Sequence, residues 1–401
     1  MAKHILFITT HNLATNPRLV KEMELALQNN YAVSVICFEF NNWSRHFNEE
    51  LKNKLGSKIN YIGIAGNRKP RWPWLMSSFL FLISKWILLF LPKHKFWLSV
   101  RCNKRSWLLM RALKKLPGSF QLMLAHNPGS FYPAWQFATK HNIPLGIDLE
   151  DYHPGESHQE SVNTIFKQLN RAILRKANFI TAASPDILEY SEKDLEDTLK
   201  SKRVVLNYFP STEFVLPVAN DADTLSLVWF SQNISFGRGL EQLIPVIKNH
   251  PQIALHLFGH CNTNFKNQWL HDTENIHLHG PLPQAQLHQK LCQFDVGLAI
   301  EPGKDVNNEL ALSNKMLAYF QAGIYILASK TIAQSRFINS FPQHGMVSSL
   351  QPPELKQAIE TLLQQKEGIR SSAIQRFENA TMHNWETESQ GLLKLWQQHS
   401  S

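Results

Sequence analysis

Residues 295–329 read DVGLAIEPGKDVNNELALSNKMLAYFQAGIYILAS and contain the clearest structural pattern of the chain. An apolar run ends near Ile300, a polar loop follows, and a helical pattern extends from Ser313 to Gly323, directly before the next apolar run. This order of strand, loop and helix is typical of a parallel sheet covered by helices. The unpaired N–H groups at the start of such a helix favour a diphosphate. Ordinary α/β packing remains the alternative.

Two loops supply candidate donor-binding residues. In the stretch above, Leu312 and Ser313 lead into the helix, Ser313 is a suitable N-cap, and Asn314 and Lys315 would add donors and a cation. The second loop lies within 228–240, VWFSQNISFGRGL, where an arginine stands between two glycines at a predicted helix start. Such an arginine can approach phosphate oxygens in a bidentate way, although it could also be a solvated surface residue. The candidates in this loop are Ser231, Asn233, Gly237, Arg238 and Gly239.

Apolar runs alternate with amphipathic helical patterns along the whole chain, which predicts parallel sheets covered on both faces. The stretch 208–224, YFPSTEFVLPVANDADT, interrupts the alternation and is interpreted as a linker between two α/β halves. Two such domains would bind ligand in the cleft between them, at the carboxyl ends of their strands. The predicted strands are 4–9, 32–37, 59–64, 122–125, 145–149, 178–183, 203–207, 225–231, 253–258, 276–279, 295–300 and 325–328.

Length and composition exclude several classes of protein. A chain of 401 residues suits two or three domains, and 43% hydrophobic residues exclude a disordered polymer. Four cysteines, without a C-x-x-C pair, argue against a disulfide framework or a zinc ribbon. The sequence lacks G-x-G-x-x-G, Walker A, H-E-x-x-H and G-x-S-x-G motifs, and it contains no recognised nucleic-acid-binding module.

The positive charge is concentrated in one segment. The net charge is +9, but no Asp or Glu occurs between Glu50 and Asp148, and 12 of the 41 Lys and Arg residues lie within 68–115. The same segment contains five of the 11 tryptophans. Clustered cations and tryptophans suit an anionic membrane surface, so we expect this segment to face a membrane.

Within this segment, residues 74–91, WLMSSFLFLISKWILLFL, predict an apolar helix of about 27 Å. Its polar residues, Ser77, Ser78, Ser84 and Lys85, recur at a spacing of seven and therefore form one stripe. Three interpretations compete: a transmembrane span, a buried core helix, and a helix lying in the membrane interface. The basic and tryptophan-rich flanks favour the interfacial helix, and a span would separate strands of one sheet.

Several segments together resemble the GT-B glycosyltransferases, particularly the large retaining family that uses nucleotide sugars. SFGRGLEQLI is similar to the family's basic donor loop, which implies that Arg238 holds the donor diphosphate. HLHGPLPQAQLHQKLCQFDVGLAI would place Gly280 near the nucleotide base, and SNKMLAYFQAGIYILAS resembles the donor-site helix. LAHNPGSFYPA would place His126 opposite the transferred sugar, across the cleft.

The chain departs from the family at two glutamates. Many members carry a pair separated by seven residues, the second of which holds the nucleotide ribose. The corresponding positions here are Leu310 and Ala318, and Glu301 and Glu309 have the right gap in the wrong register. Recognition of the ribose is therefore in doubt, although Glu309 could still reach the sugar.

The first half supplies the candidate acceptor-binding residues. His11, Asn12 and Arg18 follow the first strand, and Arg18 could touch a phosphate. Capping side chains and a solvated cation are the alternative. Glu150 and Asp151 end another strand, where they could bind acceptor hydroxyls, act as a base or cap a helix.

The sequence thus predicts an α/β protein of the GT-B fold. Its expected parts are an acceptor domain at 1–212 with the membrane-facing insertion 66–115, a donor domain at 213–383, and a returning helix at 384–401. The resemblance implies a retaining, metal-independent glycosyltransferase with catalytic residues His126, Glu309 and Arg238. The expected donor is a UDP- or GDP-linked sugar with no separate cofactor. The acceptor would be a membrane-associated glycan or glycolipid of bacterial cell-surface polysaccharide synthesis, at the cytoplasmic face. A nucleotide-sugar epimerase and a degenerate scaffold protein are the alternatives.

Overall fold

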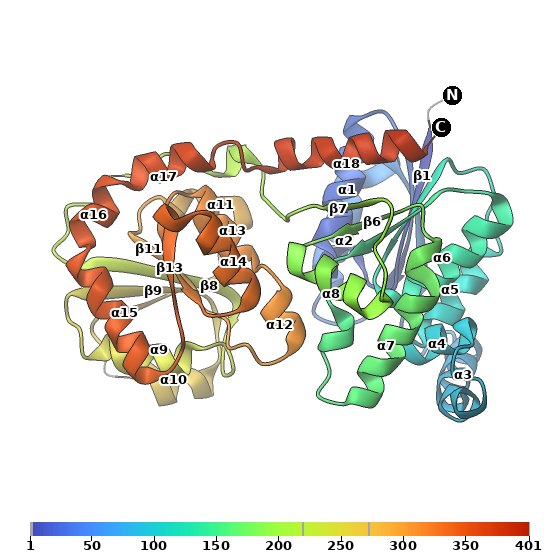
Figure 1. Cartoon of the computed structure of the whole chain (residues 1–401), viewed down its shortest axis with the longest axis horizontal. Coiled ribbons are helices and arrows are strands. Elements are labelled where there is room, and N and C mark those ends of the chain that lie inside the picture. The colour runs from blue at the N-terminus through green and yellow to red at the C-terminus, as the bar shows by residue number, and fades with distance from the viewer. Residues whose placement is uncertain (1–2, 219, 272, 401) are drawn as a thin grey trace. The chain divides into compact units, whose positions relative to one another are not determined.

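The computed structural model describes residues 3–218, 220–271 and 273–400, and the chain forms two compact units (Figure 1). The first unit comprises Met1–Leu206 and Ser389–Ser401, and the second comprises Asn207–Glu388. Each unit is built around one parallel sheet, so the predicted architecture of two Rossmann-like domains is confirmed.

The first unit contains a seven-stranded sheet in the order β3-β2-β1-β4-β5-β6-β7. Its register aligns Thr9 with His126 and His126 with Asp148, which places the carboxyl ends of three strands side by side. The strands are β1 (His4–Thr9), β2 (Ala32–Glu39), β3 (Ile59–Ala65), β4 (Leu122–His126), β5 (Leu145–Leu149), β6 (Phe179–Ala182) and β7 (Lys202–Val204). The helices are α1 (Pro17–Gln28), α2 (Arg45–Leu55), α3 (Arg71–Phe90), α4 (Lys95–Cys102), α5 (Arg105–Leu113), α6 (Pro128–His141), α7 (Glu160–Ile173) and α8 (Pro185–Leu195).

The second unit contains a six-stranded sheet in the order β10-β9-β8-β11-β12-β13. Its strands are β8 (Leu225–Ile234), β9 (Ile253–Cys261), β10 (Ile276–His279), β11 (Val296–Ala299), β12 (Tyr325–Ser329) and β13 (Gly345–Ser348). Its helices are α9 (Leu240–Lys248), α10 (Thr263–Trp269), α11 (Gln284–Leu291), α12 (Val306–Leu310), α13 (Asn314–Gln321), α14 (Ile332–Ser340), α15 (Pro352–Gln364), α16 (Lys366–Ser371) and α17 (Ala373–Ala380). The strand β13 has no counterpart among the predicted strands.

The predicted linker, 208–224, connects β7 of the first sheet to β8 of the second, and its aromatic residues anchor it in the second unit. Phe209 and Phe214 are buried, and the ring of Phe214 stacks on His288 at 5.0 Å between centroids. The carboxylate of Glu213 lies 2.6 Å from Nδ1 of the same histidine. The burial of these aromatic rings therefore holds the first part of the predicted linker against the second unit.

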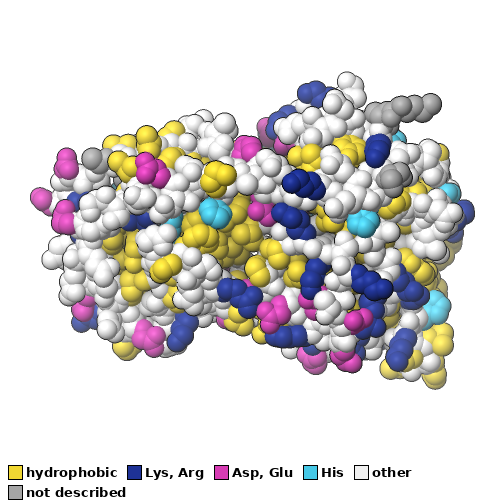
Figure 2. Space-filling view, turned by 45° about the horizontal axis from the view of Figure 1, so that its top comes forward, with side chains coloured by type: hydrophobic (Ala, Val, Ile, Leu, Met, Phe, Trp, Pro, Cys, Tyr) yellow, Lys and Arg dark blue, Asp and Glu magenta, His cyan; other side chains and the backbone are white. Residues whose placement is uncertain are grey.

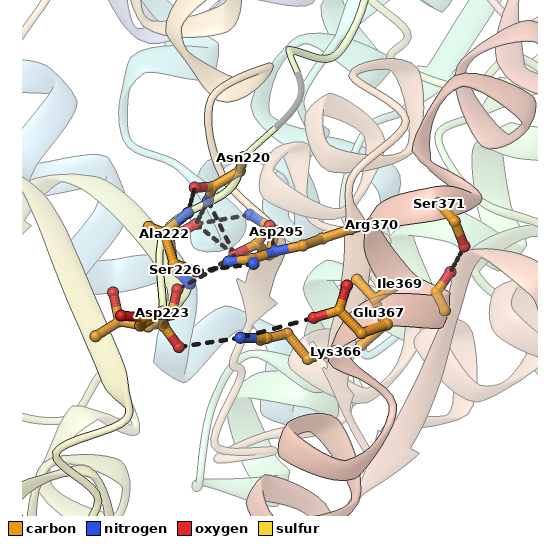
Figure 3. Close-up of polar contacts among 12 residues, drawn as sticks. Asn220, Ala222, Asp223, Ser226, Asp295, Lys366, Glu367, Ile369, Arg370 and Ser371 are labelled. Atoms are coloured by element: carbon orange, nitrogen blue, oxygen red, sulfur yellow. Dashed lines mark hydrogen bonds and ion pairs between the residues drawn. The ribbon is translucent and has the colours of Figure 1, made fainter.

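The end of this segment is held by a polar network around Asp295, which lies directly before β11 (Figure 3). Arg370 of α16 binds Asp295 through Nε and Nη2 at 3.0 and 3.1 Å, and it also donates to the carbonyls of Ala222 and Thr224. Ser226 donates to the same carboxylate at 2.8 Å through its backbone N–H and its hydroxyl. The network ties the start of β8 to α16, and every buried oxygen of Asp295 is satisfied.

Helix α3 turns two serines of its polar stripe inward, whereas Lys85 of the same stripe is exposed. Ser77 and Ser84 are buried, and their hydroxyls donate to carbonyls of the helix itself, Ser84 to Phe81 at 2.6 Å. The helix packs on α4 and α5 at the outer end of this unit (Figure 1). The opposite side is apolar and exposed, with Trp72, Leu75, Phe79, Leu82, Trp86 and Leu89 between 51% and 68% exposed. The interpretation as a buried core helix is therefore wrong.

The last helix, α18 (Trp385–His399), begins among the residues of the second unit and ends in the first. Trp396 is fully buried, and its ring lies edge-on to Phe7 and Tyr31, at 6.1 and 6.4 Å between centroids. The core of the first unit thus contains a side chain from the end of the chain.

Candidate functional site

The loop after β8 delivers an arginine to the carboxyl end of β11. Gly239 has φ +82°, in the left-handed region, and a Cβ there would lie 2.3 Å from Cγ2 of Ile300, so glycine fits best. The close approach brings the Gly237–Gly239 loop against the end of β11. Arg238 is exposed, and no carboxylate of the described residues pairs with it. Its guanidinium is therefore available to an anion.

The start of α13 lies at the same strand end. Ser313 is its N-cap, as predicted, and its hydroxyl accepts a hydrogen bond from Met316 N at 3.3 Å. Lys315 Nζ lies 2.7 Å from Oε1 of Glu301, the residue that follows Ile300. It also lies 5.7 Å from the ring centroid of Trp229 on β8. Contacts through Ile300 and Glu301 therefore join the Arg238 loop and the α13 start into one surface, at the ends of adjacent strands β8 and β11.

The remaining donor candidates are distributed around this surface. Ser231 and Asn233 lie in the irregular end of β8, where the pairing with β9 shifts register. Asn314 is exposed and accepts a hydrogen bond from Asn207, and Leu312 is half-buried. Gly280 follows the edge strand β10, where a Cβ would meet no atom within 4 Å. Packing thus gives no reason for a glycine at this position.

The acidic candidates have definite partners. Oε2 of Glu309 accepts a hydrogen bond from Ile332 N at 3.2 Å, at the first residue of α14. Ala318 is fully buried on α13, so no carboxylate occupies the position that the family uses for the ribose. Glu301 was considered only for its spacing, yet it is the acid that contacts Lys315. Its place directly after an apolar strand was the available sequence signal.

In the first unit, four charged side chains form a closed cluster at the strand ends. Arg18 donates from Nε and Nη2 to the two carboxylate oxygens of Asp148, at 2.8 and 2.9 Å. His126 Nε2 lies 3.3 Å from Oε2 of Glu22, and its Nδ1 lies 3.5 Å from Oδ2 of Asp148. Arg18 is 1% exposed and His126 is 0% exposed. The two basic side chains thus contact the two acidic ones, and all four are almost completely shielded from solvent.

This burial shifts the pKa values of the cluster. Burial alone lowers the pKa of His126, but Glu22 and Asp148 outweigh it and raise that pKa to about 10, so the ring is protonated at neutral pH. Burial alone raises the pKa of Asp148, but Arg18 and His126 hold it below its usual range. The His126 ring and the Asp148 carboxyl are therefore both charged at pH 7.

Three of the predicted site residues have structural partners within the protein. His126 and Arg18 are buried, and their polar atoms contact the other members of the cluster, so Arg18 is not the solvated cation of the alternative. Asn12 is also buried, where it caps the short 3-10 helix Leu13–Thr15 and donates to Ser44 Oγ at 2.7 Å. In this structure the three side chains are buried near the strand ends and hydrogen-bond or pair with neighbouring residues.

Two other acceptor candidates, His11 and Glu150, are partly exposed. His11 follows β1, and burial, together with the nearby His153 and Arg105, lowers its pKa to about 4. Glu150 follows β5, and burial with the charges of Asp151 and Asp148 raises its pKa to about 8. A carboxyl with such a pKa can exchange a proton near neutral pH.

Among the residues that the structure describes, two groups of side chains have a spacing that could hold a metal ion. Glu22, His126 and Asp148 form the first, but the guanidinium of Arg18 already supplies a cation to Asp148 there. Asp151, His153 and Glu156 form the second, on the surface of the first unit. Neither group lies on the surface that carries Arg238 and Lys315.

Comparisons with known proteins identify the fold. It is that of the GT-B glycosyltransferases, which confirms the resemblance seen in the sequence. HepE from Anabaena, solved with UDP, superposes with a TM-score of 0.67 at 13% identity, covering 98% of each chain. Sucrose-phosphate synthase from Thermosynechococcus elongatus gives 0.68 at 14% identity, covering 99% of this chain and 98% of its own. The lipopolysaccharide outer core galactosyltransferase WaaB gives 0.61 at 14% identity, covering 98% of each. No protein-family model matches the sequence, and no curated protein is significantly similar to it.

Proposed function

We propose that the protein is a retaining glycosyltransferase that moves a sugar from a nucleoside diphosphate sugar to a membrane-associated glycan or glycolipid. The observation that carries this proposal is the surface joining the Arg238 loop to the start of α13. It combines a guanidinium without a carboxylate partner among the described residues, a second cation and an N-capped helix start, at the ends of two neighbouring strands. These are the groups that stabilise negative charge on a leaving diphosphate.

In the proposed reaction, the bond between the anomeric carbon and the diphosphate breaks, and the acceptor oxygen forms the new bond on the same face. Arg238 binds the diphosphate as its charge grows, and the cationic and backbone donors make a metal ion unnecessary. Glu150 is suited to take the acceptor proton, because its pKa of about 8 is close to the working pH. UDP is the first nucleotide to test, since HepE was solved with UDP.

The test is a calorimetric titration of UDP, GDP and ADP into the wild type and into Arg238→Ala. We expect one nucleotide to bind, and we expect the variant to lose roughly 10- to 100-fold in affinity, the contribution of a charged hydrogen-bonded pair. Lys356→Ala is the matched control, because it removes an exposed cation from α15 of the same unit.

Equal affinity of wild type and Arg238→Ala would reject the assigned site. If the wild type binds none of the three nucleotides, the result would favour a scaffold protein. Turnover then separates the two enzymes: a transferase consumes the sugar nucleotide only with an acceptor, and an epimerase converts it without one.

Helix α3 supports the proposal that the protein binds a membrane. It is the one helix of the described residues that is long and apolar enough to cross a membrane. However, Ser77, Ser84 and Leu88 are buried on its inner side, which favours a helix that lies along the surface over one that spans. Basic and hydrophobic side chains lie next to one another at this end of the unit (Figure 2). We therefore place the protein at the cytoplasmic face of the membrane, bound through 68–115.

Substitutions on the two sides of α3 test this placement. Leu82→Ser and Trp86→Ser together should weaken binding to anionic vesicles by about 100-fold or more, because each exposed side chain contributes roughly 2 kcal/mol on insertion. Ser84→Ala, on the inner side, is the control and should leave vesicle binding unchanged. Flotation measures both, and equal flotation of all three proteins would contradict an interfacial helix.

A further inference from the structure

Two lysines of the first unit face the same tryptophan ring. Lys95 begins α4, and Lys176 ends the short 3-10 helix Leu174–Lys176 that follows α7. Lys95 Nζ lies 4.4 Å from the centroid of the Trp135 ring on α6, and Lys176 Nζ lies 5.5 Å from it. Helix α4 packs against both α6 and α7, which brings these residues together (Figure 1). Lys95 and Lys176, the lysine pair, therefore place two positive charges at one point of the unit.

The charge of the lysine pair is not neutralised within the protein. Among the residues that the structure describes, no carboxylate forms an ion pair with either ammonium group. Burial and the neighbouring charge of Lys176 lower the pKa of Lys95, so the two groups oppose one another. The ring of Trp135 attracts each cation but leaves this repulsion in place. An anion bound between the two ammonium groups would offset it, because each would then face an opposite charge.

The start of α4 adds hydrogen-bond donors beside Lys95. Its N-cap, His94, makes no side-chain cap, and the first backbone bond of the helix runs from Leu98 N to the carbonyl of His94, at 3.0 Å. The N–H groups of residues 95–97 are therefore without a partner in the described part of the chain. Backbone donors and ammonium groups together suit the oxygens of a phosphate.

The surroundings of the lysine pair indicate which phosphate this is. Phe90, the last residue of α3, and Leu91 are 84% and 50% exposed. A tight turn follows, in which His94 N donates to the carbonyl of Leu91 at 3.1 Å, and Lys95 comes next. A lipid whose alkyl chain contacts Phe90 and Leu91 would thus have its headgroup at the lysine pair. The indole of Trp135 suits the same level, since tryptophans gather at the interface between membrane and water.

We propose that the lysine pair binds the terminal phosphate of a membrane lipid. This inference rests on the proposed membrane placement and specifies the headgroup that this surface recognises. A phosphate monoester carries roughly 1.5 to 2 negative charges at pH 7, which matches two ammonium groups. A phosphodiester carries a single charge and would leave part of the repulsion between the lysines. The lysine pair therefore selects monoester headgroups and holds the C-terminal end of α3 at the membrane surface.

The test compares two kinds of phosphatidylcholine vesicle in flotation of the full chain without sugar nucleotide. One kind contains phosphatidic acid, whose phosphate is a monoester, and the other contains phosphatidylglycerol at the same total charge. We expect the wild type to bind the phosphatidic acid vesicles at least about fivefold more tightly. Lys95→Gln with Lys176→Gln should abolish this preference, because each cation near an anionic surface is worth about fivefold.

Lys114→Gln with Lys115→Gln is the matched control, because it removes two exposed lysines that follow α5. This control should keep the preference. Equal binding of the wild type to the two kinds of vesicle, or the same loss of preference in the control, would overturn the proposal. If inorganic phosphate binds in solution as tightly as the vesicle phosphate, the ligand is soluble and the lipid assignment is wrong.

This result is separable from the membrane placement itself. If Leu82→Ser with Trp86→Ser reduces flotation on both kinds of vesicle but the wild type shows no preference, the interfacial helix stands and only the headgroup site fails. If those substitutions in α3 have no effect while the preference depends on the lysine pair, the interfacial helix fails and the phosphate site stands.

Discussion

The two units place arginines at the ends of their strands in opposite ways. In the first unit Arg18 is 1% exposed and donates to both carboxylate oxygens of Asp148, so an internal ion pair neutralises its charge. In the second unit Arg238 is exposed on a glycine-flanked loop, without a carboxylate partner among the described residues. The same strand-end geometry thus supports a structural cluster in one unit and a candidate ligand site in the other. Burial and pairing distinguish the two, whereas residue type and spacing do not.

The largest effect should come from opening the closed cluster. Arg18→Met leaves the Asp148 carboxylate buried without its main partner, and we expect the free energy of unfolding to fall by about 3–5 kcal/mol. Arg238→Met, at an exposed site, should change it by less than about 0.5 kcal/mol. Calorimetric unfolding at pH 7 measures both, and similar losses in the two variants would remove the distinction between the units.

Alkaline pH should weaken the same cluster. The pKa of His126 is about 10 in the folded protein and 6.5 in the unfolded chain, so its stabilisation is complete below pH 6.5 and is lost between pH 6.5 and 10. Glu150, with its raised pKa, acts in the same direction between about pH 4.5 and 8. We expect the wild type to lose a few kcal/mol more than His126→Gln between pH 8 and 10, where Glu150 no longer titrates. Parallel curves for the two proteins would show that the ring is neutral in the fold.

A smaller effect tests the open site. Glu301 neutralises Lys315 at 2.7 Å, so Glu301→Gln should release a cation to the diphosphate and tighten nucleotide binding by about three- to tenfold. Glu360→Gln removes an exposed carboxylate of α15 and serves as the control. Calorimetry decides between the outcomes, and weaker binding in Glu301→Gln would mean that this acid contributes to the site.

Sequence patterns located the strands well, because a buried parallel strand must be continuously apolar. Of the 13 strands in the described part of the chain, 12 lie at predicted positions. The strand β13 was missed because Gly345–Ser348 is short and contains only one β-branched residue. The GT-B fold and the N-cap at Ser313 were also predicted correctly.

The tertiary contacts of the sites could not be predicted in the same way. Asp148 lies 130 positions from Arg18, so no local pattern shows that the two side chains neutralise one another. The serine stripe of α3 was visible in the sequence, but its direction depends on the neighbouring helices. The segment 208–224 was predicted as a linker, but its anchoring could not be foreseen, because its buried aromatic rings have partners far along the chain.

The burial of Trp396 has a consequence for biosynthesis. During translation, residues 1–206 emerge first and contain every strand of their sheet, but the side chain that completes their core follows roughly two hundred residues later. The core of the first unit therefore lacks this side chain until the whole second unit has been synthesised. The unit whose synthesis begins first is therefore the one whose core is completed last.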